Sequence, residues 1–129
     1  MYLIDTNIFL EVLLGQKNKE KCKSFLRRIY SGEKVVVTSF SLHSIIVIME
    51  SFGKTKELKQ FLLSLLELKG MIIVYTRLED EIKILELAGS KNLDFDDALQ
   101  YYVAKLYKAE AIISYDRHFD DLDIRREEP

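Results

Sequence analysis

Three groups of aspartates, far apart in the sequence, carry the clearest chemical signal in this chain. Asp5 lies within residues 3–7, a second group occupies residues 94–97, and a third begins at Asp116. Carboxylate oxygens are the ligands that hard divalent cations such as Mg²⁺ prefer, and few are needed because the ion keeps several waters. If the fold brings the three groups together, the chemistry they favour is metal-assisted hydrolysis of a phosphodiester bond.

Each aspartate also has a structural interpretation. Asp5 and Asp94 are of a residue type favoured at helix N-caps, and Asp116 and Asp120 fit a solvated acidic loop. Asp97 is different, because it lies inside the first turn of an apolar helical stripe rather than before it. Any one of these residues alone leaves both interpretations open, and it is their joint occurrence that favours a metal site.

Short apolar runs predict the strands that would position these acids. The runs lack polar alternation and are separated by helical segments, which indicates a parallel sheet covered by helices on both faces. Asp5 and Asp116 then follow two different strands, at the sheet edge where α/β folds bind ligands. The predicted strands span residues 1–4, 34–38, 71–75 and 111–114, with a short edge strand starting near Ile124.

Apolar residues at helical spacing predict the helices between these strands. Thr6 or Asn7 is the expected N-cap of the first helix, and Ser39 or Ser41 that of the third. Residues 115–123 are expected to form an acidic loop. The predicted helices span about residues 6–14, 17–31, 41–52, 55–69, 77–90 and 94–108.

Composition limits the class of protein. The 129 residues are 48% hydrophobic, and we expect one domain over residues 1–129. The net charge is −2, but the first 70 residues carry 11 basic and 7 acidic side chains, and the remainder carries 8 and 14. Acid is therefore concentrated where a cation site is expected. With Cys22 as the only cysteine and no apolar stretch of membrane-spanning length, we expect a cytoplasmic protein without a membrane segment.

Four segments resemble the PIN domain family, a family of metal-dependent nucleases that includes the VapC-like toxins of toxin–antitoxin pairs. They occur in the family's order and spacing, and together they cover essentially the whole chain. The resemblance implies a three-layer α/β/α sandwich around a central parallel sheet of four to five strands. The segments are Leu3-Ile4-Asp5-Thr6-Asn7, Val36-Val37-Thr38-Ser39-Phe40-Ser41, Phe95-Asp96-Asp97-Ala98-Leu99-Gln100 with Ala104, and residues 111–120.

The resemblance also implies an activity and a set of site residues. The activity is cleavage of single-stranded RNA with Mg²⁺ or Mn²⁺. The family's metal-binding acids map onto Asp5, Asp97 and Asp116, with Asp120 as an additional catalytic acid. An antitoxin partner and a homodimer are common in the family, and both are expected to use apolar surface left on the helices at 41–52 and 55–69.

One position departs from the family pattern. A glutamate usual in the helix after the second strand aligns with Ser44, beside His43. Glu50 is nearly two helical turns further, at ~1.5 Å per residue, and is not expected to replace it. Asp94, Asp96 or His43 are the candidates to compensate. The alternative function is therefore a catalytically weakened PIN-fold module that binds RNA or protein.

A phosphatase using Asp5 is a third hypothesis. Phosphatases of the haloacid dehalogenase type need a second aspartate two residues later. Asn7 occupies that position, which disfavours this class.

Overall fold

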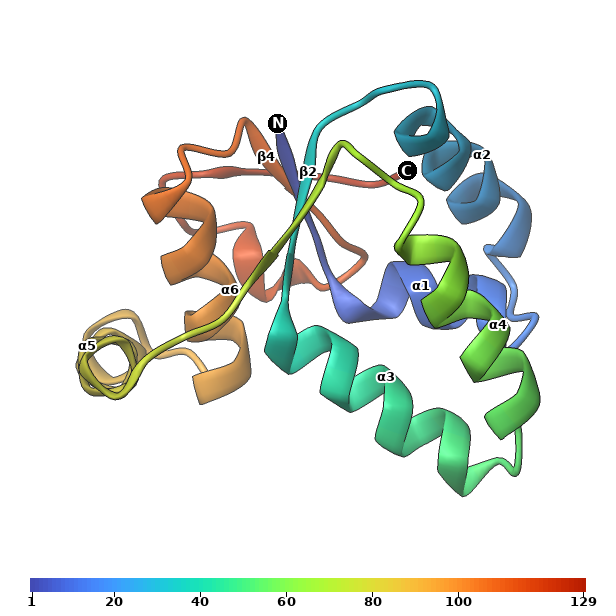
Figure 1. The fold of residues 1–129 in the computed structure, drawn as a ribbon. Helices are drawn as coiled ribbons and strands as arrows, with labels where there is room; N and C mark the ends of the chain where they lie inside the picture. Colours follow the sequence, from blue (N-terminus) through green and yellow to red (C-terminus); the bar gives the residue numbers. More distant parts are fainter.

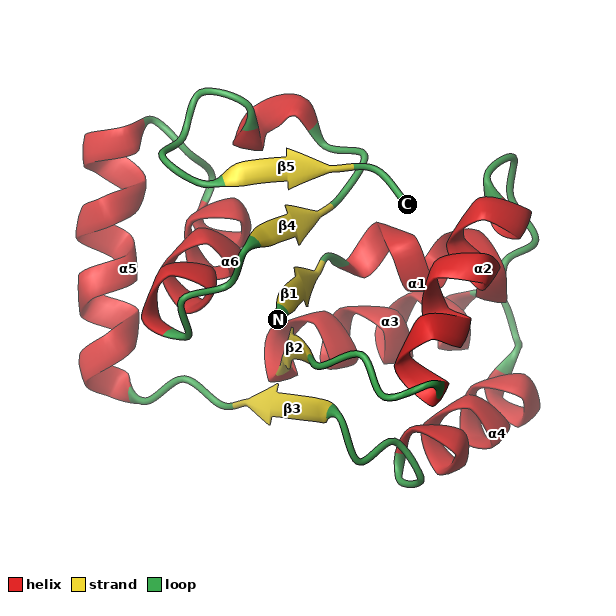
Figure 2. Cartoon of the chain, turned by 90° about the horizontal axis from the view of Figure 1, so that it is seen from above, coloured by secondary structure: helices red, strands yellow, loops and turns green.

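The computed structural model describes residues 1–129 and has a central sheet with helices on both faces (Figures 1 and 2). Five strands form this sheet: β1 (Tyr2–Ile4), β2 (Val35–Thr38), β3 (Met71–Val74), β4 (Ala111–Ile113) and β5 (Arg125–Glu127). Their order is β3-β2-β1-β4-β5, and every neighbouring pair is parallel. The predicted α/β/α sandwich with a parallel sheet is confirmed, and the edge strand expected from Ile124 begins one residue later.

The predicted helices are all present. Seen from above, α1 to α4 lie on one side of the sheet and α5 and α6 on the other (Figure 2). The fourth ends four residues earlier than expected, and a 3-10 turn interrupts the loop predicted at 115–123. The helices are α1 (Thr6–Leu13), α2 (Lys19–Tyr30), α3 (Ser39–Ser51), α4 (Thr55–Leu65), α5 (Leu78–Lys91) and α6 (Phe95–Leu106), with the 3-10 turn η1 (Arg117–Phe119).

The caps expected at Thr6 or Asn7 for α1 and at Ser39 or Ser41 for α3 are wrong, whereas the alternative interpretation of Asp5 as an N-cap is confirmed. The cap of α1 is Asp5, whose Oδ1 accepts a hydrogen bond of 2.7 Å from the backbone nitrogen of Thr6. The cap of α3 is Thr38, whose Oγ1 accepts a 3.1 Å bond from the backbone nitrogen of Ser41. Thr38 is the last residue of β2 and also caps α3, whereas Asp5 is the single residue between the end of β1 and the start of α1.

Two apolar clusters fill the space between the layers. Successive side chains of a strand point to opposite faces, so Leu3 and Ile112 pack towards α5 and α6. Ile4 and Ile113 pack towards α1 to α4. Both faces of the central strands β1, β2 and β4 are covered, which explains their continuous apolar runs in the sequence. The edge strand β5 is charged and partly exposed.

The connection between β4 and β5 is anchored rather than a free loop. Phe119, the last residue of η1, is completely buried in the cluster beneath α6. This anchor fixes the turn that carries Asp116 at its N-cap and His118 in its middle. No helix of the structure is long and apolar enough to span a membrane.

Candidate metal centre

The sheet topology explains why acids more than a hundred residues apart meet. The chain builds β2 and β3 on one side of β1, then places β4 on the other side. Ile4 and Ile113 are register partners, so the residues that follow them, Asp5 and Ser114, emerge side by side. A crevice at the carboxyl end of strands where the winding direction reverses is the usual ligand site of such sheets.

Asp5 is held rigidly in this crevice. Its Oδ2 accepts a 2.6 Å hydrogen bond from Ser114 Oγ, and its Oδ1 accepts bonds from the backbone of Thr6 and from Gln100 Nε2 at 3.3 Å. Burial raises the pKa of Asp5 above its ordinary value, and the nearby charge of Asp116 raises it further, against the lowering effect of these hydrogen bonds. An extra positive charge at this position would therefore be favourable.

A buried polar network supports Asp5 from behind. Gln100 Nε2 donates to Ser41 Oγ at 2.6 Å, and Thr38 Oγ1 donates to Gln100 Oε1 at 3.3 Å. Thr6 Oγ1 adds a 2.9 Å bond to Ser41 Oγ. Buried polar groups that satisfy one another in this way fix side-chain positions. Sequence reasoning missed this network, although Gln100 is a polar residue within an otherwise apolar helical stripe.

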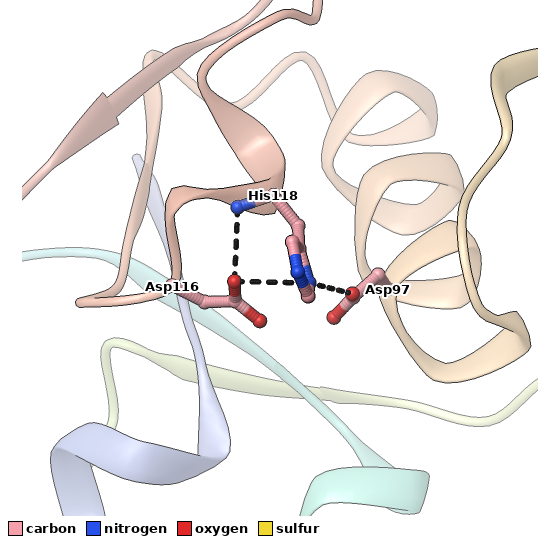
Figure 3. A group of neighbouring side chains, drawn as sticks. All are labelled: Asp97, Asp116 and His118. Carbon is pink, nitrogen blue, oxygen red and sulfur yellow. Dashed lines mark hydrogen bonds and ion pairs between the residues drawn. The ribbon is translucent and has the colours of Figure 1, made fainter.

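Asp97, Asp116 and His118 form a compact group (Figure 3). His118 Nδ1 lies 3.1 Å from Asp97 Oδ2 and 3.1 Å from Asp116 Oδ1, so the ring stands between the two carboxylates. Asp116 Oδ1 also accepts a 2.9 Å bond from the backbone nitrogen of His118, which closes the N-cap of η1. One ligand atom from each residue lies within 4.8 Å of the others.

The electrostatics of this group fit a cation. Burial is the main cause that raises the pKa of Asp97 to about 6, and the charges of Asp116 and Asp96 add to it, while His118 lowers it. The hydrogen bond to Asp97 and the charge of Asp116 raise the pKa of His118. Carboxylates that repel one another in a partly buried site ionise more readily when a metal ion neutralises them.

Asp5, Asp97 and Asp116 line a cleft of about 310 Å³, together with Asn7, one atom of which has no hydrogen-bond partner. Asn7 Oδ1 is buried and accepts no hydrogen bond, although its amide nitrogen donates to Asp5 Oδ2. An acceptor without a donor beside several carboxylates fits a site that takes a hydrated divalent cation. The cleft is lined by Asp5, Thr6, Asn7, Leu10, Phe40, Ser44, Ile48, Asp96, Asp97, Gln100 and Asp116.

The four predicted site residues lie in three different surroundings. Asp97 and Asp116 come together, and Asp5 lines the same cleft without belonging to the compact group. Asp120 points elsewhere: its Oδ1 pairs with Arg126 Nε at 2.6 Å, and it does not line the cleft. The metal-binding and catalytic roles of all four residues stay predictions.

The position of the missing glutamate faces the same cleft. Ser44 lines the cleft, whereas His43 and Glu50 are exposed and do not. Asp96 also lines it, and Asp94 lines a neighbouring polar hollow. Among the candidates to compensate for the glutamate, Asp96 is therefore the best placed, and His43 is not placed to do so.

His118 is the residue that sequence reasoning left without a role. The signal available in the sequence was its position two residues after Asp116. The 3-10 turn that directs the ring back onto the carboxylates was not predicted, because it depends on Phe119 entering the core.

Comparison with known proteins identifies the family. The family model of the PIN domain matches residues 2–125. The chain belongs to the PIN domain family. The resemblance inferred from the four sequence segments is thereby confirmed, and a search of curated protein sequences finds no match to this PIN domain.

Several solved structures share the fold of this chain. Mycobacterium tuberculosis VapC20, a Sarcin-Ricin loop cleaving toxin, superimposes with a TM-score of 0.79 at 12% identity, covering 100% of both chains. A toxin–antitoxin complex from Klebsiella pneumoniae gives 0.73 at 16% identity, covering 95% of this chain and 93% of that one. VapBC2 from Rickettsia felis, bound to a DNA fragment from its promoter, superimposes with a TM-score of 0.71 at 16% identity. The match covers 98% of this chain and 97% of that one. At these identities the likeness to this PIN domain is one of fold.

Proposed function

We propose that this PIN domain is a Mg²⁺- or Mn²⁺-dependent endoribonuclease that hydrolyses phosphodiester bonds of single-stranded RNA, and that it is the toxin of a toxin–antitoxin pair. The observation that carries the proposal is the convergence of Asp97, Asp116 and His118 beside Asp5 at the carboxyl edge of the sheet. The fold shared with VapC20, a toxin that cleaves the Sarcin-Ricin loop, supports RNA as the substrate.

Asp5, Asp97 and Asp116 are the residues that would hold the cation. When bound, the ion supplies a Lewis acid that polarises the phosphodiester and lowers the pKa of water. Ser114 and Gln100 fix the direction of the Asp5 carboxylate through their hydrogen bonds. Asp120 is proposed as an additional catalytic acid, which would have to leave its ion pair with Arg126 to reach the cleft.

A second polar hollow gives a path for the RNA backbone. It measures about 350 Å³, shares Asp97 with the acidic cleft, and includes Lys91, Arg117 and His118 in its lining. Lys and Arg side chains bind phosphates and position the strand without reading its bases. The two hollows together would place successive phosphates on either side of Asp97.

The experiment that tests the proposal is cleavage of labelled single-stranded RNA. We expect cleavage in Mn²⁺ or Mg²⁺, its loss on adding excess chelator, and its return when Mn²⁺ is added beyond the chelator. Cleavage that continues under chelation would contradict the metal-dependent mechanism. RNA binding without cleavage under every metal condition would instead support the binding-module alternative, which the serine at position 44 favours.

Restoring an acid at position 44 is a second test. Ser44 faces the cleft that holds Asp5, Asp97 and Asp116, so Ser44→Glu is expected to add a carboxylate to the site. We expect Mn²⁺ affinity and RNA cleavage to rise by about tenfold, the scale on which groups around a metal alter its binding. The measurements are Mn²⁺ titration and initial cleavage rate.

The control for this variant is Ser51→Glu, at the far end of the same helix. Ser51 is exposed and does not line the cleft. Equal effects of the two substitutions would show that general negative charge, and not a ligand at position 44, causes the change.

Partners are part of the proposal. An apolar hollow of about 300 Å³ between α1, α2 and α4 is suited to an antitoxin segment. Val47 on α3 and Leu63 on α4 are exposed, as are Phe52 and Leu66, the residues that directly follow these two helices. We propose that a homodimer covers such surface. The proposal also includes a single domain over residues 1–129 and a cytoplasmic location. The only cysteine, Cys22, is free and buried, which is consistent with that location.

A further inference from the structure

We propose that His118 is a nitrogen ligand of this metal centre and makes it favour a first-row transition ion over Mg²⁺. The proposal rests on the proposed function, because it assumes a cation held by Asp97 and Asp116. It adds a ligand that the sequence motifs did not supply, and it gives the site an ion preference.

The first argument is the position of the imidazole. Nδ1 lies 3.1 Å from an oxygen of Asp97 and 3.1 Å from an oxygen of Asp116, two residues on different elements. A neutral imidazole nitrogen offers either one hydrogen or one lone pair. A protonated ring likewise carries only one hydrogen at Nδ1, so without a metal ion that hydrogen is shared between two carboxylate oxygens, and a lone pair at Nδ1 is repelled by both. A cation bound by all three atoms removes this conflict.

The second argument is the distance from Nδ1 to each of the two carboxylate oxygens. Neighbouring ligands at right angles in an octahedral site, with bonds of about 2.1–2.2 Å, are about 3.0 Å apart. The separations of 3.1 Å between Nδ1 and the two oxygens match this value. The backbone of His118 is fixed independently of any metal, by the cap bond to Asp116 and by the buried neighbour Phe119, and its ring is 67% exposed and therefore accessible to a cation.

The third argument concerns ion preference. Mg²⁺ takes oxygen ligands and accepts nitrogen reluctantly, whereas imidazole is a good ligand for first-row transition ions. Position 44 supplies no carboxylate to the cleft because it is a serine, whereas His118 supplies a nitrogen next to Asp97 and Asp116. The exchange of one charged oxygen ligand for a neutral nitrogen lowers affinity for Mg²⁺ more than for Mn²⁺ or Co²⁺.

The chain offers a matched control, because its other histidine, His43, is also exposed but lines neither of the two polar hollows. Metal-free protein labelled with ¹⁵N-histidine is loaded with Mn²⁺ and studied by pulsed electron paramagnetic resonance. We expect a nitrogen coupling in the wild type and in His43→Gln, and its loss in His118→Gln. The Mn²⁺ dissociation constant of His118→Gln should rise by about tenfold or more, with a smaller change for Mg²⁺ measured by competition.

The outcomes separate this inference from the proposed function. Mn²⁺ binding that is abolished by Asp97→Asn but shows no nitrogen coupling in the wild type overturns the ligand role of His118 and leaves the aspartate site standing. An unchanged ratio of Mn²⁺ to Mg²⁺ affinity in His118→Gln overturns the ion preference. A wild type that binds no Mn²⁺ at millimolar concentration overturns both proposals.

Discussion

The Asp97→Asn variant is expected to lose RNA cleavage by about 100-fold to 1000-fold while becoming more stable than the wild type without metal. The activity loss follows because the substitution removes a charge that would hold the cation, whose contribution to catalysis is several kcal/mol. Asp97 belongs to both groups of three acidic or metal-ligating residues in the structure and lines both polar hollows. No other predicted ligand has so many neighbours of this kind.

The gain in stability follows from the pKa of the same carboxyl. Burial raises the pKa of Asp97 to about 6 in the folded protein, against about 3.9 in an unfolded chain. The folded state therefore binds the proton more tightly, and this contribution to stability is present below pH 4 and lost as pH rises through 6. A pKa difference of about two units corresponds to about 3 kcal/mol in the free energy of unfolding. Residual contact of the carboxyl with water reduces this to about 1–2 kcal/mol.

Thermal unfolding of metal-free protein at several pH values measures this effect. At pH 7.5 the variant should unfold a few degrees higher than the wild type, at about 2–6 °C per kcal/mol, and the difference should disappear near pH 4. Saturating Mn²⁺ should reverse the order, because only the wild type binds it. Glu86→Gln, a change of an exposed acid on α5, should alter neither cleavage nor stability. A variant less stable than the wild type at pH 7.5 would contradict the electrostatic argument.

Phe119→Ala is expected to lower the free energy of unfolding by about 3–5 kcal/mol, the usual cost of removing a buried phenylalanine. Phe119 is fully buried among Leu3, Val36 and Ile112, and it is the anchor of η1. Its loss frees the turn that positions Asp116 and His118. We therefore also expect Mn²⁺ to raise the unfolding temperature less in this variant than in the wild type.

Urea unfolding monitored by circular dichroism measures the first effect. Phe52→Ala is the matched control, because Phe52 follows α3 and is 62% exposed. Its change in stability should stay within about 0.5 kcal/mol, as is usual for surface positions. Similar midpoints for the two variants would show that η1 is not anchored through Phe119.

The sequence was most informative where chemistry and periodicity agreed. The strand runs were continuous and apolar because the sheet is buried on both faces, and their observed positions match the predictions to within a residue or two. Asp97 stood out because an acid within an apolar helical stripe has no packing role. The pairing of β1 with β4 followed from the winding of the chain and not from any residue pattern, so the meeting of Asp5 with Ser114 was not predicted.

The parts that were missed depend on contacts distant in sequence. Gln100 is a polar residue in an apolar stripe, and only the fold shows that its partners are Asp5 and Ser41. The caps of α1 and α3 were expected one or more residues late, although Asp5 also fitted a cap, because the sequence does not show how closely a helix follows a strand. His118 acquires its orientation from a 3-10 turn of three residues, too short for any periodic signal.

The placement of β1 in the middle of the sheet has a consequence for the order of folding. β1 pairs with β2 on one side and with β4, which begins only at Ala111, on the other. Pairing of such distant segments carries a high loop-closure cost and forms late in folding. Asp5 and Asp116 therefore meet only when β1 and β4 pair, and a partly folded chain that already holds β1 against β2 has no assembled acidic cleft.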